Sequence, residues 1–349
     1  MQPPSSLPYQ LRRQAIWCER LGSPLYSHLL SRCADDYESG GASRALLLGH
    51  ENDSDASMLP LSLMGAIHRL VLEGEVARLT KFYPSVGGTP DCNGAWLAFR
   101  DTVQQQKDTI RSLIKNPVQT NDVGRSGSLF GGFGVISQRT RMPLRLLEVG
   151  TSAGLNLRWD RFRYEWSGGG WGEVNSAVRL ENVFVDAAPS IPPRIEIVER
   201  AGCDPSPVDV HTDSGRLTLI SYIWADQVDR IRRLQDAISI ARTTPCVIDK
   251  AGGADWLEER LQKSFPGAAT VIFHSLVWPY MSKPERKRIT AVIENAGNRA
   301  SENAPVAWLT MEPNRASSFE IRLRIYPGFE EQVIATSLPH APAVHWLYK

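Results

Sequence analysis

The chain has 349 residues, of which 42% are hydrophobic and 22% are charged. This composition is typical of a folded globular protein, and it excludes a disordered, collagen-like or fibrous chain. The 39 Lys and Arg residues nearly balance the 38 Asp and Glu residues, which leaves a net charge of +1. Because so small a charge provides no overall attraction for a polyanion, we expect no nucleic-acid partner.

Cysteine usage and the N-terminal sequence predict a cytoplasmic protein. The five cysteines are far apart and form no Cys-x-x-Cys pair, so the sequence predicts neither a disulfide framework nor a metal site. The first residues lack the basic and apolar regions of a secretory leader. No apolar run reaches the length of about 18 residues that a membrane span requires. We therefore expect no membrane association.

Residues 1–142 are predicted to form a helical N-terminal domain. Apolar residues recur every three or four positions in 96–114, apart from one gap over Lys107. Weaker patterns of the same kind cover 11–21, 24–34 and 59–72. This spacing places the apolar residues on one face of each helix.

Residues 143–349 are predicted to form an α/β domain. Short runs rich in Val, Ile and Leu alternate with helical stretches, which predicts a mostly parallel sheet flanked by helices. The expected strands are 144–149, 194–198, 247–249, 269–276 and 306–310, and the expected helices are 226–241, 254–264 and 283–296. Strict alternation in 319–326 predicts an antiparallel strand, and the Gly- and Pro-rich residues 167–193 predict a loop insertion.

The most specific motif lies in Leu146–Leu157. A strand ending in Glu148 is followed by small residues and by the start of a helix, in the pattern E-x-G-x-S-x-G. In a doubly wound sheet this turn lies where the strand order reverses, and small residues let a ligand approach the backbone. The acidic residue suits a ligand with an amine, and the pattern is typical of S-adenosylmethionine enzymes of the methyltransferase fold. The alternative is a turn that needs glycine for its backbone geometry alone.

We expect several residues to bind this cofactor. They are Glu148, Gly150, Ser152, Gly154 and Asn156, with Asp249 at the adenine and Glu165 at the ribose. Glu199, at the end of the predicted strand 194–198, competes with Glu165, because Glu165 follows Gly154 too closely for an intervening helix. Helix capping is an equal interpretation for Asp249.

Polar residues after the other strands are candidates for chemistry on a substrate. His274 and Tyr280 follow the strongest late strand and are the candidate catalytic residues, although a lone histidine is often structural. Asn121, Arg125 and Glu312 are candidates for substrate binding. An N-capping stretch before the next helix explains the residues around 121 nearly as well.

The same turn also matches the nucleophile elbow G-x-S-x-G of serine hydrolases. Chain order allows Ser152 to be followed by Asp249 or Glu312 as the acid and by His340 or His345 as the base. A hydrolase sheet, however, has several strands before the elbow, where this sequence predicts helices.

Five segments together resemble a bacterial family. They are residues 22–26, 119–126, 146–164, 224–227 and 273–275. They are similar to the uncharacterised family known as domain of unknown function 2332, over nearly the whole chain. The resemblance implies a methyltransferase-like sheet preceded by helices, and it implies no particular substrate. The chain has Asp122, Thr151 and Ile248 where we expect Glu, Ala and Gly.

The sequence thus predicts an α/β protein with a Rossmann-like sheet of the S-adenosylmethionine methyltransferase type and an N-terminal helical domain. The predicted function is S-adenosylmethionine binding with methyl transfer to a small molecule. The alternatives are a serine hydrolase that uses Ser152 and a non-catalytic binding module on the same fold. The sequence specifies neither the substrate nor the oligomeric state.

Overall fold

The computed structural model describes residues 6–314, 318–340 and 343–348. The chain divides into two compact units. Unit 1 comprises Met1–Thr120 and His211–Arg232, and unit 2 comprises Asn121–Val210 and Arg233–Lys349.

Unit 1 consists of helices, and its described residues contain no strand. The α-helices are α1 (Leu7–Arg20), α2 (Pro24–Glu38), α3 (Ala42–Leu47), α4 (Leu59–Leu72), α5 (Ala77–Thr80), α6 (Cys92–Gln105), α7 (Lys107–Ile114) and α9 (Asp213–Ser221). Two short 3-10 helices are η1 (Asp55–Ser57) and η2 (Pro84–Val86), and α10 (Val228–Thr243) crosses the division between the units. The gap over Lys107 in the apolar pattern is a break between two helices.

The segment 211–232 completes the core of unit 1. Trp224 and Ala225 are buried in the same apolar cluster as the residues of the N-terminal helices. The carboxylate of Asp226 accepts hydrogen bonds from Ser23 Oγ at 2.6 Å and from Leu25 N at 3.1 Å. Because Ser23 and Leu25 begin α2, Asp226 caps that helix from a distant part of the sequence.

Unit 2 contains the strands and the remaining helices. The strands are β1 (Leu144–Val149), β2 (Arg163–Trp166), β3 (Gly169–Gly172), β4 (Arg179–Leu180), β5 (Ile197–Asp204), β6 (Val247–Lys250), β7 (Ala269–Ser275), β8 (Val306–Pro313), β9 (Phe319–Tyr326), β10 (Phe329–Ser337) and β11 (His345–Trp346). The helices are α8 (Arg125–Thr140), η3 (Asn156–Arg161), α11 (Gly253–Arg260), η4 (Trp278–Tyr280) and α12 (Lys283–Asn298). The predicted boundary at residue 142 follows α8, whereas the division into units groups α8 with the sheet.

The main sheet has eight strands and is mostly parallel. Its order is β11-β10-β9-β8-β7-β1-β5-β6, and the five strands from β8 to β6 are parallel. Strands β9, β10 and β11 each run antiparallel to the strand before them in the chain, which confirms the antiparallel strand predicted for 319–326. The central strands β1 and β7 are buried along their whole length, so they carry the continuous apolar runs seen in the sequence.

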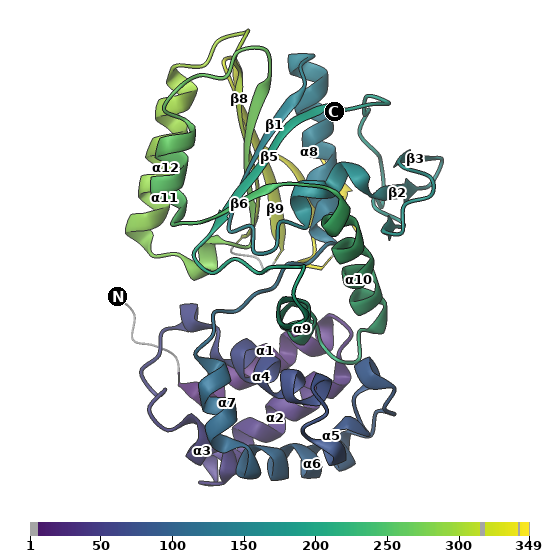
Figure 1. Ribbon diagram of the computed structural model, residues 1–349, viewed down its shortest axis with the longest axis vertical. Helices are drawn as coiled ribbons and strands as arrows, with labels where there is room; N and C mark the ends of the chain where they lie inside the picture. Colours follow the sequence, from purple (N-terminus) through teal and green to yellow (C-terminus); the bar gives the residue numbers. More distant parts are fainter. Residues whose placement is uncertain (1–5, 315–317, 341–342, 349) are drawn as a thin grey trace. The chain divides into compact units, whose positions relative to one another are not determined.

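Helices cover both faces of this sheet, with α11 and α12 on one side and α8 on the other (Figure 1). Glycines allow α8 to approach the strands closely. A Cβ atom at Gly132 would lie 2.4 Å from Leu309 Cδ1 of β8, and one at Gly131 would lie 2.4 Å from the Trp346 ring. These glycines bring the backbone of α8 close to its neighbours, and side chains of the same helix also pack there, as Phe133 does against Phe273 of β7.

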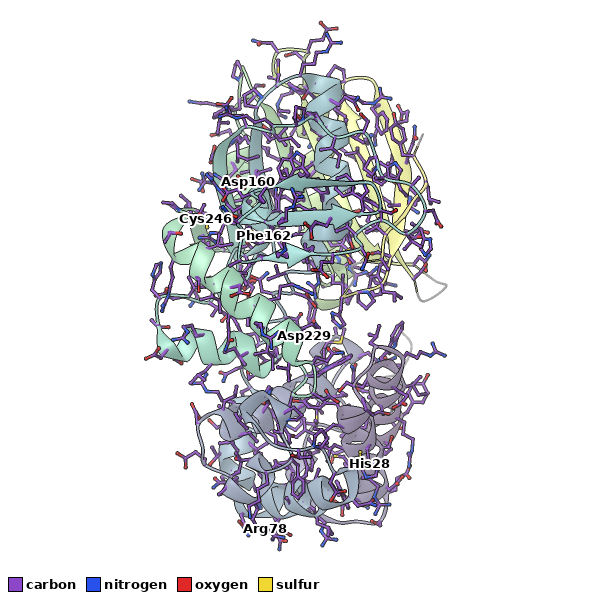
Figure 2. All side chains as sticks on the ribbon, turned by 90° about the vertical axis from the view of Figure 1, so that its right-hand side faces the viewer. His28, Arg78, Asp160, Phe162, Asp229 and Cys246 are labelled. Carbon is purple, nitrogen blue, oxygen red and sulfur yellow. The ribbon has the colours of Figure 1, made fainter. Side chains whose placement is uncertain are left out.

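The connection between β1 and β5 differs from the expected helix and loop. The helix predicted after Gly154 is the six-residue 3-10 helix η3, and the predicted loop insertion contributes β3 and β4 to a small sheet of order β3-β2-β4. Asp160 of η3, labelled in Figure 2, accepts a hydrogen bond from Arg200 of β5 at 2.5 Å. This contact holds η3 beside the main sheet.

Candidate functional site

The strand order of the main sheet reverses between β1 and β7. From β1 the chain continues to β5 and β6 on one side, and it then returns to β7 and β8 on the other side. In open α/β sheets, ligands bind at the carboxyl ends of the strands beside such a reversal. Here Glu148 lies opposite Phe273 of β7, and Val149 lies opposite Cys203 of β5. Most of the predicted site residues are found around these strand ends.

Glu148 is buried at the end of β1, with 2% of its surface exposed. Its Oε2 accepts a hydrogen bond from Thr151 Oγ1 at 2.5 Å. Burial raises the pKa of the Glu148 carboxyl to about 8, although the hydrogen bond from Thr151 and the positive charges of Arg125 and Arg158 lower it. The carboxyl is therefore largely protonated at neutral pH.

The turn after β1 has a left-handed backbone at three positions. The φ angles are +71° at Gly150, +53° at Ser152 and +68° at Gly154. A Cβ atom at Gly150 would lie 2.6 Å from Val277 Cγ2, and one at Gly154 would lie 3.0 Å from Ile248 Cδ1. Side chains of the protein therefore fill the space into which a Cβ atom of Gly150 or Gly154 would project, and a ligand was expected to occupy that space. These glycines serve backbone geometry and close packing.

Asp204 ends β5 and holds this turn, although no motif of the sequence points to it. Its carboxylate accepts hydrogen bonds from Ser152 N at 3.0 Å and from Ser206 N at 2.8 Å. The predicted strand 194–198 begins and ends too early, because β5 runs from Ile197 to Asp204. Glu199 consequently lies near the amino end of β5, opposite Arg145, and is wrong as a ribose ligand at the carboxyl edge. Pro205 after Asp204 was the available signal for the true strand end.

The polar segment that begins at residue 121 contacts the turn directly. Asn121 Oδ1 accepts a hydrogen bond from Leu155 N at 3.1 Å, and Ser126 Oγ donates to Asn156 Oδ1 at 2.6 Å. All three polar side chains are buried. Asn121 and Asn156 therefore fix the start of α8 against the turn.

Arg125 connects the same segment to β7. Its side chain is buried, and NH1 donates a hydrogen bond to the carbonyl oxygen of Ser275 at 3.2 Å. Three of the segments that carry the family resemblance, around residues 121–126, 146–164 and 273–275, thus meet at one edge of the sheet.

His274 is buried at the end of β7, and both ring nitrogens have partners. Trp308 Nε1 donates to His274 Nε2 at 3.3 Å, and His274 Nδ1 lies 2.8 Å from Glu312 Oε1. Since Nε2 accepts, Nδ1 carries the proton and donates it to Glu312. His274 therefore positions Glu312 and the two tryptophans around it, Trp278 and Trp308. Tyr280, in contrast, is 38% exposed in η4.

Asp249 of β6 interacts with α11. Its Oδ2 accepts hydrogen bonds from Trp256 Nε1 at 2.7 Å and from Arg260 NH2 at 2.8 Å. The hydrogen bond from Arg260, followed by that from Trp256, lowers the pKa of Asp249. This carboxylate therefore supports the packing of α11 on the sheet.

Glu165 lies on β2 of the small sheet. Its carboxylate pairs with Arg163 at 3.2 Å and with Arg179 at 2.5 Å. Both partners belong to the small sheet, so the structure does not bring Glu165 together with Glu148.

The acids and histidines that a hydrolase would need have other partners. The pairs are Asp249 with Arg260, Glu312 with His274, Asp122 with His340, and Asp186 with His345. None of the pairings expected from chain order is formed among them. In the described part of the chain, β1 is also the first strand, so the sheet lacks the strands that precede a nucleophile elbow.

The described residues lack two further kinds of feature. They contain no group of three or more His, Cys, Asp or Glu side chains arranged to hold a metal ion. None of their helices combines the length and apolar character that crossing a membrane requires.

Together these features define a mixed α/β protein whose mostly parallel sheet carries a buried polar network where its strand order reverses. The chain belongs to the family described as uncharacterised proteins conserved in bacteria, domain of unknown function 2332, which matches residues 9–346. No curated protein and no solved structure matches the chain.

Proposed function

We propose that this protein binds S-adenosylmethionine at the carboxyl ends of β1 and β5 and transfers its methyl group to a small molecule. One observation carries the proposal: two carboxyl groups, Glu148 and Asp204, flank a glycine-containing turn beside the reversal of strand order. Parallel strands in the order β6-β5-β1-β7-β8 support a Rossmann-like sheet of the methyltransferase type.

The two carboxyl groups suit different parts of the cofactor. Glu148 would pair with the cationic amine of its amino-acid part. Asp204 would accept hydrogen bonds from the ribose hydroxyls, because its two oxygens have lone pairs beyond those used by Ser152 N and Ser206 N. Since side chains fill the Cβ side of Gly150, the ligand would lie along the backbone edge of the turn. Asp249 fits an adenine contact poorly, because Trp256 and Arg260 already engage its carboxylate.

The buried state of Glu148 adds a specific expectation for binding. A carboxyl group with a pKa near 8 is mostly neutral at pH 7, and a cationic amine beside it favours the ionised form. Cofactor binding should therefore release a proton from Glu148. The amount released can be measured by repeating a calorimetric titration in buffers of different ionisation enthalpy.

Calorimetric titration of the full chain with S-adenosylhomocysteine tests the proposal. We expect saturable binding, and Asp204→Asn should weaken it by about tenfold, because a hydrogen bond to a charged group is lost. Asp186→Asn is the control, since Asp186 pairs with His345 on the surface and lies outside the turn. Absence of binding to the folded wild-type chain would overturn the proposal. Covalent labelling of Ser152 by a fluorophosphonate would instead establish the hydrolase alternative.

A further inference from the structure

A pocket of about 780 Å³ opens on unit 2, away from the turn after β1. Its base is one face of the strands β8, β9 and β10, and Trp278 of η4 lies at its side. Helix α12 packs on the same face where Val306 pairs with Tyr326, and both side chains join its apolar cluster. Toward the carboxyl end of β8 this face becomes polar, since Thr310 lies on it opposite Arg322. The cofactor proposal does not use this pocket.

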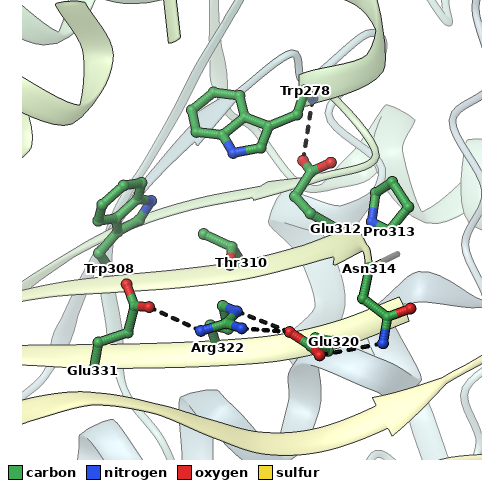
Figure 3. Close-up of a pocket in the computed structure, with 9 residues that line it drawn as sticks. All are labelled: Trp278, Trp308, Thr310, Glu312, Pro313, Asn314, Glu320, Arg322 and Glu331. Carbon is green, nitrogen blue, oxygen red and sulfur yellow. Dashed lines mark hydrogen bonds and ion pairs between the residues drawn. The ribbon is translucent and has the colours of Figure 1, made fainter. Parts of the chain in front are cut away.

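Polar side chains from the strands form a fixed row along the pocket. Arg322 donates to Glu320 Oε2 from Nε at 3.0 Å and from NH2 at 2.5 Å, and it donates to Glu331 Oε1 from NH1 at 3.0 Å. Asn314 Nδ2 donates to Glu320 Oε1 at 3.2 Å. In Figure 3, this row lies across Thr310 from the two indole rings of the pocket. Because these planar groups hold one another, they lose little conformational freedom when a ligand binds.

The row keeps hydrogen-bonding capacity for a ligand. The NH1 and NH2 groups of Arg322 each have a second N–H, which the contacts with Glu320 and Glu331 do not use. Oε2 of Glu331 accepts no hydrogen bond from the described residues. The row therefore offers donors and acceptors side by side. Adjacent hydroxyl groups, each of which can donate and accept, match such a pattern.

Two neutral polar groups of the lining also remain available. Trp278 Nε1 and Thr310 Oγ1 form no hydrogen bond with the residues that the structure describes. Neither atom belongs to the buried unpaired atoms, so both have accessible surface. Glu312 differs, because His274 holds its Oε1 and its Oε2 is buried. We therefore assign contacts with a ligand to Trp278 and Thr310 and none to Glu312.

The indole rings give the pocket apolar area beside these polar groups. Trp278 and Trp308 are both half-buried. The N–H group of Trp308 donates to His274 at 3.3 Å, so this side chain offers only its ring to a ligand. A flat indole ring buries the C–H groups of a saturated ring that lies on it. The pocket thus fits a ring that has an apolar face and hydroxyl groups around its edge.

We infer that this pocket binds a neutral sugar of one or two pyranose rings, whose C–H face packs on an indole ring and whose hydroxyls bond to Thr310, Trp278 and the row of Arg322. The lining has three carboxylates and one guanidinium, so it repels an anionic sugar. An organic cation has no acceptor for the N–H groups of Arg322 and Trp278. The volume lies in the range of about 300–1,000 Å³ that suits a small organic ligand. The site does not depend on the proposed cofactor, because none of its residues belongs to the turn after β1.

Saturation-transfer difference NMR of the full chain tests this inference, because the method detects weak binding of small ligands. The probes are the neutral disaccharides maltose, cellobiose, lactose, mannobiose and chitobiose. We expect saturation transfer to at least one of them, strongest at the C–H protons on one face of a ring. Glucuronic acid, which has a pyranose ring with a negative charge, should give no signal. Tetramethylammonium, which has charge without hydroxyls, should not displace the sugar.

Two conservative variants locate the bound sugar, with affinities measured by titration of the signal. Thr310→Val keeps the β-branched shape and removes the hydroxyl, so it should weaken binding by about fivefold through the loss of one hydrogen bond. Thr270→Val is the matched control, since Thr270 is a buried strand residue at the amino end of β7 and outside the pocket lining. Should Thr310→Val fail to fold, Trp278→Phe carries the test, because it keeps an aromatic ring and removes the N–H.

Three results would overturn the inference. The first is that none of the neutral disaccharides binds to the folded wild type. The second is that glucuronic acid or tetramethylammonium binds more tightly than every neutral sugar. The third is that the pocket variant that folds binds the sugar as tightly as Thr270→Val does.

Discussion

Replacement of Glu148 by Gln should change how the stability of the protein depends on pH. The pKa of this carboxyl is about 8 in the folded protein and 4.5 when unperturbed. Between these two values the folded state binds the proton more tightly than the unfolded state does. The free energy of unfolding therefore falls as pH rises through this window.

The size of the effect follows from the two pKa values. The free energy of unfolding falls by about 1.4 kcal/mol for each pH unit between the two pKa values, so the wild type loses about 5 kcal/mol over the whole interval. Glu148→Gln keeps the shape and an acceptor for Thr151 Oγ1 but cannot ionise. The variant should match the wild type at about pH 4, below both pKa values, and become progressively more stable than it toward pH 8.

Urea unfolding followed by tryptophan fluorescence, at a series of pH values, measures this difference. The difference in unfolding free energy between variant and wild type removes the contributions of all other titrating groups. The Glu330→Gln variant, whose side chain is exposed, controls for the loss of one formal charge. If the stabilities of Glu148→Gln and wild type stay parallel from pH 5 to pH 8, Glu148 is ionised in the folded protein. The argument from burial would then be refuted.

Three further substitutions test the packing described above by chemical denaturation. Gly150→Ala should lower the free energy of unfolding by about 3 kcal/mol, because the new Cβ atom strains the left-handed backbone and clashes with Val277. Adding Val277→Ala should restore only the part of this loss that is due to the clash. His274→Ala should lower the free energy of unfolding by about 3 kcal/mol, because it leaves a cavity and removes the hydrogen-bond partner of Glu312 and Trp308. An unchanged unfolding midpoint would contradict the structural role of this ring. Asp226→Ala should lower the free energy of unfolding by about 2 kcal/mol, because it removes the cap of α2, and an unchanged unfolding midpoint would contradict that cap.

Elements with a clear period and clear boundaries could be predicted from the sequence. The bounds of α4, β1 and β9 agree with the predicted ranges 59–72, 144–149 and 319–326. In each of them the apolar spacing reflects burial on one face or on both. The range 96–114, predicted as one helical stripe, is instead divided at Gln106 into α6 and α7.

Elements held by pairs of polar residues were harder to predict. Strand β5 contains Glu199 and Arg200, which form ion pairs with Arg145 and Asp160 on neighbouring elements. These charges hide the strand from any apolar pattern, so the prediction stopped at Val198. Strand β10 was missed because polar residues and irregular pairing with β9 interrupt its alternation.

The candidate site was partly visible in the sequence. Motifs placed Glu148, Asn121 and His274 near strand ends or before the sheet, and the structure brings them to one edge. The sequence could not reveal that Val277 fills the Cβ side of Gly150, because that contact depends on the register between distant strands. It also could not show that Asp204, rather than Glu199, ends β5.

The return of residues 211–232 to unit 1 has a consequence for how the chain folds during synthesis. In many two-part proteins the N-terminal part is complete as soon as it leaves the ribosome. Here the core of unit 1 lacks Trp224, and α2 lacks its cap from Asp226, until β1 and β5 of unit 2 have already been made. The first 120 residues must therefore wait, with apolar helix faces uncovered, for a segment that is translated much later. Closing so long a loop is slow, so this interval is when the nascent chain most needs protection from aggregation.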